Sequence, residues 1–141
     1  MSKAVREQRK DIRKASFAGA TALTVFQLFK NEQGPLPLTS GDFNPDGQDL
    51  LLVVSGSGYR IPSVGTGLVG FDIYLDDDTY LGSSQVVTNA TNSHVATIPL
   101  TLLVENVGPG DHTITLQAQQ DTTTDLNDYF NVMVEDYVIP G

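Results

Sequence analysis

The 141-residue chain contains no cysteine and no tryptophan, and basic residues are nearly absent outside its first 14 positions. Without cysteine, neither a disulfide framework nor a thiolate metal site is possible. The stability of the fold must therefore come from a hydrophobic core or from neighbouring subunits. The length suits one domain with a substantial core and a short appendage.

Charge is distributed unevenly between the start of the chain and the remainder. Residues 1–14 hold six Lys and Arg residues against two acidic residues, which gives +4, whereas residues 15–141 hold two against fifteen, which gives −13. A basic arm on an acidic body indicates that the arm has a binding partner of its own. Its basic side chains are Lys3, Arg6, Arg9, Lys10, Arg13 and Lys14.

The basic arm, residues 1–14, has few apolar positions. Val5 and Ile12 alone give too narrow a stripe to hold a helix against a core. A solvated terminus and an arm that becomes ordered on another protein both fit this composition. Nucleic-acid binding is disfavoured, because the arm has no aromatic residue for stacking and the acidic body would repel a polyanion.

Residues 15–29 are mostly apolar and follow the basic arm, an order that secretory signals share. Four polar residues dilute this run, and it ends without a small-residue cleavage pattern. It is also too short and too polar to span a bilayer. We therefore predict a first β-strand from about Thr21 to Lys30 and no contact with a membrane.

Alternation of apolar and polar residues predicts several strands with one buried face. Residues 112–118 and 130–134 both alternate, and the polar loop between them predicts an antiparallel hairpin that needs a second sheet to cover it. Residues 71–75 alternate in the same way. Residues 49–55 form a continuous apolar run, which is typical of a buried sandwich strand.

Turn signals separate these predicted strands. Asp76–Asp78 is interpreted as a hairpin tip and not as an acidic site, because adjacent side chains in a turn point in different directions. Residues 94–103 are strand-like, and Pro99 favours an edge strand or a bulge. These patterns predict an all-β fold, a jelly-roll-type antiparallel β-sandwich with an N-terminal basic arm or short helix.

One loop has the spacing of a calcium-binding loop. Asp42, Asn44 and Asp46 follow the DxNxDG pattern, which places oxygens at alternate positions around an ion. The twelfth position is Val53, where a bidentate Glu belongs, and a proline stiffens the interior. We interpret the loop as an Asx-type turn and predict no bound metal, with a calcium site at these three residues as the alternative.

Catalytic motifs are missing from the sequence. There is no nucleophile elbow, phosphate-binding loop, dinucleotide fingerprint or zinc-protease helix. The two histidines, His94 and His112, fit neither a paired helical metal site nor a zinc ribbon, so each is interpreted as a structural hydrogen-bonding group at a sheet margin. We therefore expect neither enzymatic activity nor a cofactor.

The polar loop 122–130 gathers Asp125, Asn127 and Asp128 within a few residues. Short side chains of this kind cap backbone amides in loops, and we expect them to do so here. A small ion site on a symmetry axis is the alternative.

Five segments follow one another between residues 39 and 137: LLLVVSGSGYR, FDIYLDD, NSHVAT, GDHTITLQAQ and TTTDLNDYFNVMV. Their order resembles that of small jelly-roll modules in phage virion proteins and bacterial surface proteins, which are similar to the complement/tumour-necrosis-factor-like β-sandwich. The resemblance implies a module that is commonly a trimer and that binds or stabilises. In virion proteins, an appended arm often docks such a module onto a capsid or tail.

These observations lead to one expectation and one alternative. We expect residues 1–31 to be an arm and first strand that dock the protein, and residues 32–141 to be the β-sandwich. The expected function is that of a phage structural protein, a homotrimeric capsid decoration protein on the outer surface of the particle that contacts the major capsid or another virion protein. The alternative is a tail- or fibre-associated module that binds a receptor or carbohydrate, with calcium as a possible aid.

Overall fold

The computed structural model describes residues 22–46, 48–62 and 67–138, and for the first two and last two of these residues the backbone alone. The basic side chains from Lys3 to Lys14, and the question of an arm or short helix, lie outside these residues. No helix in the described ranges has the length and apolar character needed to cross a membrane.

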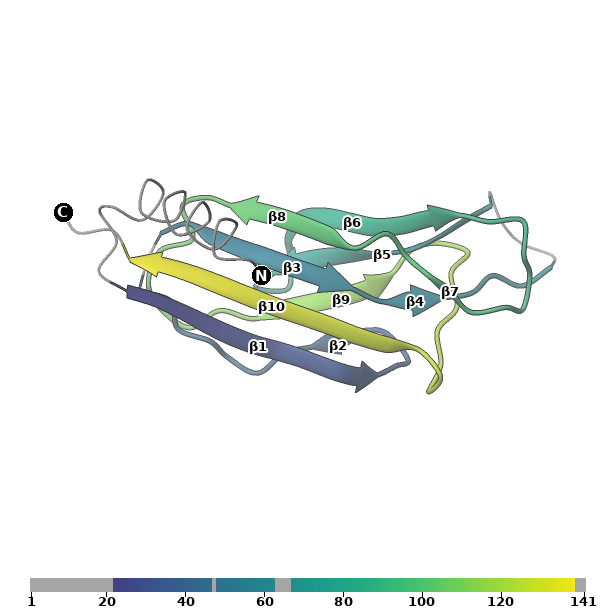
Figure 1. Ribbon diagram of the computed structural model, residues 1–141, viewed down its shortest axis with the longest axis horizontal. Coiled ribbons are helices and arrows are strands. Elements are labelled where there is room, and N and C mark those ends of the chain that lie inside the picture. Colours follow the sequence, from purple (N-terminus) through teal and green to yellow (C-terminus); the bar gives the residue numbers. More distant parts are fainter. Residues whose placement is uncertain (1–21, 47, 63–66, 139–141) are drawn as a thin grey trace, which may run out of the picture.

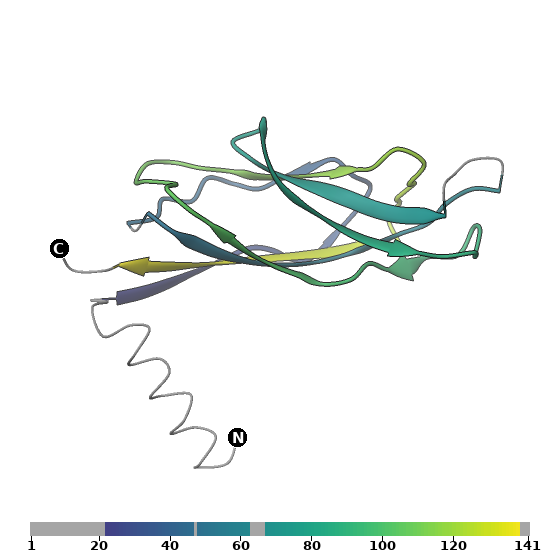
Figure 2. The same ribbon diagram turned by 90° about the horizontal axis from the view of Figure 1, so that it is seen from above.

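Two four-stranded antiparallel sheets lie face to face and form a β-sandwich (Figures 1 and 2). The first sheet has the order β1-β10-β3-β8 and consists of β1 (Ala22–Gln33), β10 (Tyr129–Val138), β3 (Leu50–Ser55) and β8 (Leu100–Val104). The second has the order β2-β9-β5-β6 and consists of β2 (Leu38–Thr39), β9 (Ile114–Ala118), β5 (Leu68–Leu75) and β6 (Thr79–Val87). A short pair, β4 (Ser57–Gly58) and β7 (Val95–Ala96), continues one end of the sandwich. The predicted fold class is confirmed.

The core lies between the two sheets and is filled by the inward residues of each alternating strand. Phe71 of β5 and Phe130 of β10 meet across it edge to face, with ring centroids 5.3 Å apart. Such large apolar side chains each stabilise the fold by about 1.5–3 kcal/mol when fully buried. The residues without exposed surface include Leu50, Leu52, Val54, Val69, Ile73, Ile114, Leu116, Phe130, Val132 and Val134.

The predicted hairpin between residues 112–118 and 130–134 is wrong, although both strands and their inward faces are confirmed. β9 pairs with β2 and β5, whereas β10 pairs with β1 and β3, so the two strands belong to opposite sheets. The loop between them crosses from one sheet to the other. Two alternating strands can bury their apolar faces against one another across a sandwich as well as side by side, and the pattern alone does not distinguish these arrangements.

The other predicted strands differ in smaller ways. Residues 50–55 form β3 as expected, but burial alternates along it and Val53 is exposed, so this strand has one buried face and not two. Asp76–Asp78 is the tip of the β5–β6 hairpin, and Asp76 and Asp77 have φ values of 54° and 73°. Pro99 separates β7 from β8, which is an edge strand of its sheet, as predicted.

The first strand is an edge strand of the sandwich. The predicted strand from about Thr21 to Lys30 is observed as β1, which runs on to Gln33 and pairs with β10 from Ala22↔Val138 to Gln33↔Tyr129. Residues 22–31 of the expected docking segment therefore belong to a sheet of the β-sandwich.

Candidate functional site

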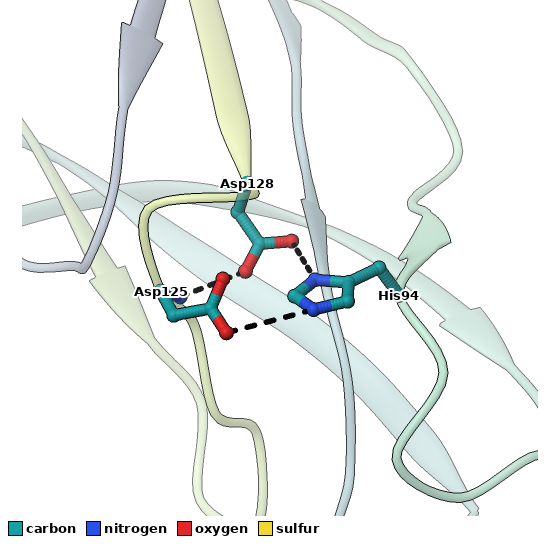
Figure 3. Close-up of side chains that lie close together, drawn as sticks. All are labelled: His94, Asp125 and Asp128. Atoms are coloured by element: carbon teal, nitrogen blue, oxygen red, sulfur yellow. Dashed lines mark hydrogen bonds and ion pairs between the residues drawn. The ribbon is translucent and has the colours of Figure 1, made fainter.

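A histidine and two carboxylates meet where the β9–β10 loop approaches the start of β7 (Figure 3). His94 Nδ1 lies 2.8 Å from Asp128 Oδ1, and His94 Nε2 lies 3.6 Å from Asp125 Oδ2. His94 immediately precedes β7, and Asp128 immediately precedes β10. The tertiary fold therefore joins residues that are 34 positions apart. We name His94, Asp125 and Asp128 the His–Asp cluster.

Asp128 is the fixed point of this cluster, because its side chain has no exposed surface. A buried carboxylate is costly unless donors surround it. Here Ser57 Oγ donates a hydrogen bond to Oδ1 at 2.6 Å, and the Asp125 backbone N–H donates to Oδ2 at 2.8 Å. His94 Nδ1 faces the same Oδ1 oxygen. Three groups from three segments of the chain are thereby held in place.

The electrostatic environment favours the protonated form of His94. The hydrogen bond to Asp128 raises the pKa of His94 above its usual value, and the negative charges of Asp128 and Asp125 add to this effect, while burial opposes it. The ring of Tyr59 packs against the imidazole with a centroid distance of 4.6 Å. The histidine is therefore held by a carboxylate at one edge and by an aromatic ring at its face.

The cluster contains the residue types of a serine hydrolase but not their order. In a catalytic triad, the serine hydroxyl donates to the histidine, and the carboxylate supports the histidine from the other side. Here the single hydroxyl hydrogen of Ser57 is directed at Asp128 and not at His94. The arrangement is suited to holding a loop or a ligand, and it does not activate Ser57 as a nucleophile.

His112 has a structural role, as the sequence predicted. Its Nδ1 lies 2.8 Å from Asp76 Oδ2, and its Nε2 lies 3.1 Å from the Gly108 carbonyl oxygen. Asp76 also accepts a hydrogen bond from the Thr113 N–H. His112 thereby ties the tip of the β5–β6 hairpin to the turn before β9.

The outer side of the β2-β9-β5-β6 sheet has a mixed polar and aromatic surface. Tyr74 of β5 is paired with Tyr80 of β6, and their rings meet at 5.9 Å, with Tyr80 57% exposed. The Tyr80 hydroxyl shares a 2.6 Å hydrogen bond with Ser83, and Ser83 donates to Asp72. We name this surface the polar aromatic face; it consists of Asp72, Tyr74, Tyr80, Ser83 and Gln117.

The outer side of the β1-β10-β3-β8 sheet is different in chemistry. Leu51 lies opposite Leu103 across β3 and β8, and Val53 lies opposite Met133 across β3 and β10. Val25, Val53 and Leu103 are exposed, Leu103 by 63%. We name this surface the apolar face; it consists of Val25, Leu51, Val53, Leu103 and Met133.

The loop predicted as an Asx-type turn makes long-range contacts. Asn44 Oδ1 accepts a hydrogen bond from the Gly110 N–H, and the Asp46 N–H donates to the buried carboxylate of Asp136 at 2.6 Å. Within the described ranges, the group with metal-ligand geometry is the His–Asp cluster and does not include Asp42 or Asp46. Calcium binding at the DxNxDG loop stays an untested alternative.

The sequence predicted part of the His–Asp cluster. Capping by the 122–130 loop is confirmed, because Asp128 Oδ2 accepts from the Asp125 N–H and Asp125 Oδ1 accepts from the Asn127 N–H. The contact with His94 was missed. No local spacing could have indicated it, since it depends on how β7 and β10 are arranged in space.

Comparison with known proteins identifies the class of fold. No protein-family model matches the chain, and no curated protein matches it either. Among solved structures, dimeric latent PorU from Porphyromonas gingivalis is similar, with 11% identity and a TM-score of 0.50. The match covers 85% of this chain but 14% of PorU, so the chain corresponds to a small part of that protein.

Two further structures are similar at lower TM-scores. VP2 of infectious bursal disease virus, from a subviral particle, has 15% identity and a TM-score of 0.41, and the match covers 85% of this chain and 33% of VP2. The C-terminal CBM6 of LamC, a marine laminarinase from Zobellia galactanivorans, has 11% identity and a TM-score of 0.42, with 85% of this chain and 94% of that one covered. At these identities, the likeness concerns the fold and not the function.

Proposed function

We propose that this protein is a non-catalytic carbohydrate-binding module that holds its ligand on the polar aromatic face. The observation that carries the proposal is the pair Tyr74 and Tyr80 on an open sheet surface, beside the hydrogen-bonding side chains of Asp72 and Ser83. Binding sites for small polar ligands combine apolar or aromatic surface with a few well-placed polar groups.

The chemistry of this face suits a sugar. A pyranose ring has apolar C–H faces, which pack on aromatic rings, and an equatorial belt of hydroxyls, which need donors and acceptors. Asp72 already accepts hydrogen bonds from Ser83 Oγ and Gln119 Nε2, so its side chain is fixed in place before a ligand arrives. A fixed site loses less conformational entropy on binding.

Tyr80→Ala provides the test of this proposal. The variant should fold normally, because Tyr80 is exposed, but it should lose most of its binding to the glycans that the parent protein retains on a glycan array. Tyr129→Ala is the matched control, since Tyr129 is also exposed, at 47%, and lies on β10 in the other sheet. If Tyr80→Ala and the parent bind alike, or if the parent binds no glycan, the proposal is wrong.

The second candidate function is that of a virion structural protein, as a homotrimer on the outer surface of a phage particle. The observation that favours it is the apolar face, since exposed apolar surface of this kind is typical of protein–protein contacts. On this reading, the apolar face contacts the major capsid protein, another virion protein or a neighbouring subunit. The basic arm, residues 1–14, adds a salt-sensitive attachment to acidic partners.

Deletion of residues 1–14 tests this second candidate. The β-sandwich should remain folded, because every described strand begins at Ala22 or later. Attachment to phage particles should fall sharply, and the attachment of the full-length protein should weaken with salt. Equal attachment of both forms at low salt would remove the arm from the account.

A further inference from the structure

We propose that His94 Nε2 and Asp125 Oδ2 are two protein ligands of a zinc-type divalent cation. The two atoms are 3.6 Å apart, which is too long for a good hydrogen bond. Ligands of a tetrahedral zinc ion, at about 2.0–2.1 Å from the metal, lie about 3.3 Å from each other. A small rotation of either side chain brings the pair to that separation. The inference does not depend on the proposed carbohydrate site.

The tautomer of His94 leaves the correct nitrogen available. Because Nδ1 faces the Asp128 carboxylate at 2.8 Å, neutral His94 carries its proton on Nδ1 and a lone pair on Nε2. A histidine ligand that donates its other N–H to a carboxylate is the arrangement found around protein-bound zinc. Asp128 supplies this outer support, and Ser57 and the Asp125 N–H fix it in turn.

The second ligand is oriented in the same way. Asp125 Oδ1 accepts the Asn127 N–H at 2.8 Å, which leaves Oδ2 directed at the imidazole (Figure 3). The side chains of His94 and Asp125 are 32% and 41% exposed, so an ion can enter from solvent and water can occupy the other coordination positions. Both ligands are thus positioned, supported and accessible.

The ligand types indicate which cation binds. An imidazole nitrogen with one carboxylate oxygen suits Zn²⁺ and its neighbours Co²⁺ and Ni²⁺, whereas Ca²⁺ and Mg²⁺ prefer sites made wholly of oxygen. Two protein ligands form a weak site, so we expect binding at micromolar or higher concentrations of zinc and not a tightly retained structural metal.

The test is a titration of untagged full-length protein with ZnCl₂ by calorimetry, with CoCl₂ absorption as a direct report of ligation. The parent should bind one Zn²⁺, and MgCl₂ should not compete. His94→Gln and Asp125→Asn should each weaken binding by about tenfold or more. His112→Gln is the matched control and should bind like the parent, because both ring nitrogens of His112 already face oxygen atoms of the protein.

A direct readout keeps the test decisive if a variant fails to fold. In ¹⁵N-labelled parent protein, Zn²⁺ should shift the His94 Nε2 resonance and leave His112 unchanged. The inference is overturned if millimolar Zn²⁺ produces no binding, if it shifts His112 alone, or if folded His94→Gln binds zinc as tightly as the parent.

Discussion

At the scale of single residues, the most consequential side chain is Asp128. It has no exposed surface, and it accepts hydrogen bonds from Ser57, from the Asp125 backbone and from His94. A buried charge is tolerated only when such donors surround it, and removal of one partner leaves the others unsatisfied. Asp128 therefore explains why the 122–130 loop has one conformation and why His94 is oriented.

The contact between Asp128 and His94 predicts a dependence of stability on pH. Since the hydrogen bond raises the pKa of His94 above 6.5 in the folded protein, the contact stabilises the fold fully below pH 6.5. This stabilisation is lost as the pH rises through the folded pKa. The groups that face the imidazole are Asp125, Asp128 and the ring of Tyr59.

Thermal melting between pH 5.5 and pH 8.5, with a chelator present, measures this contribution. The melting temperature of the parent should decrease relative to that of His94→Gln as the pH rises, and the two curves should converge at high pH. His112→Gln should retain the His94 contribution. Parallel curves for the parent and His94→Gln would show that the contact has no linked proton.

At the scale of elements, the sequence predicts the strands better than their partners. Alternation identifies the inward residues of β5, β9 and β10, because burial of one face is a local property of the strand. Pairing depends on where each strand lies in the sandwich. The assignment of β9 and β10 to one hairpin was wrong for this reason, since both arrangements bury the same residues.

The register of β9 gives the sharpest prediction about stability. Leu116 has no exposed surface, whereas Gln117 is exposed on the outer side of the same strand. Leu116→Lys places an unpaired charge in the core, at a cost of several kcal/mol, which approaches the whole stability of a small domain. Gln117→Lys should melt within a few degrees of the parent. A reversed outcome in circular dichroism melts would shift the register by one residue.

At the scale of the whole molecule, the two sheets present opposite surfaces. The β2-β9-β5-β6 sheet carries the polar aromatic face, and the β1-β10-β3-β8 sheet carries the apolar face. Sequence alone indicates the outward positions of each strand. It does not predict that Tyr74 and Tyr80 meet, because their pairing follows a register shift after Ile73. Surfaces assembled across strands become apparent once the pairing is established.

The division between the two faces supports a module that binds a ligand with one sheet and a protein with the other. A trimer or a particle that covers the apolar face would leave the polar aromatic face free. The acidic body is compatible with this arrangement, because 15 acidic residues between positions 15 and 141 keep the surface outside the contact soluble.

The most direct test of the central claim is an NMR titration of the ¹⁵N-labelled protein with an oligosaccharide identified on a glycan array. We predict that amide shifts cluster at Asp72, Tyr74, Tyr80, Ser83 and Gln117, and that they vanish in Tyr80→Ala but persist in Tyr129→Ala. Shifts that cluster instead on Val25, Leu51 and Leu103 would contradict the account, because they would place the ligand on the apolar face.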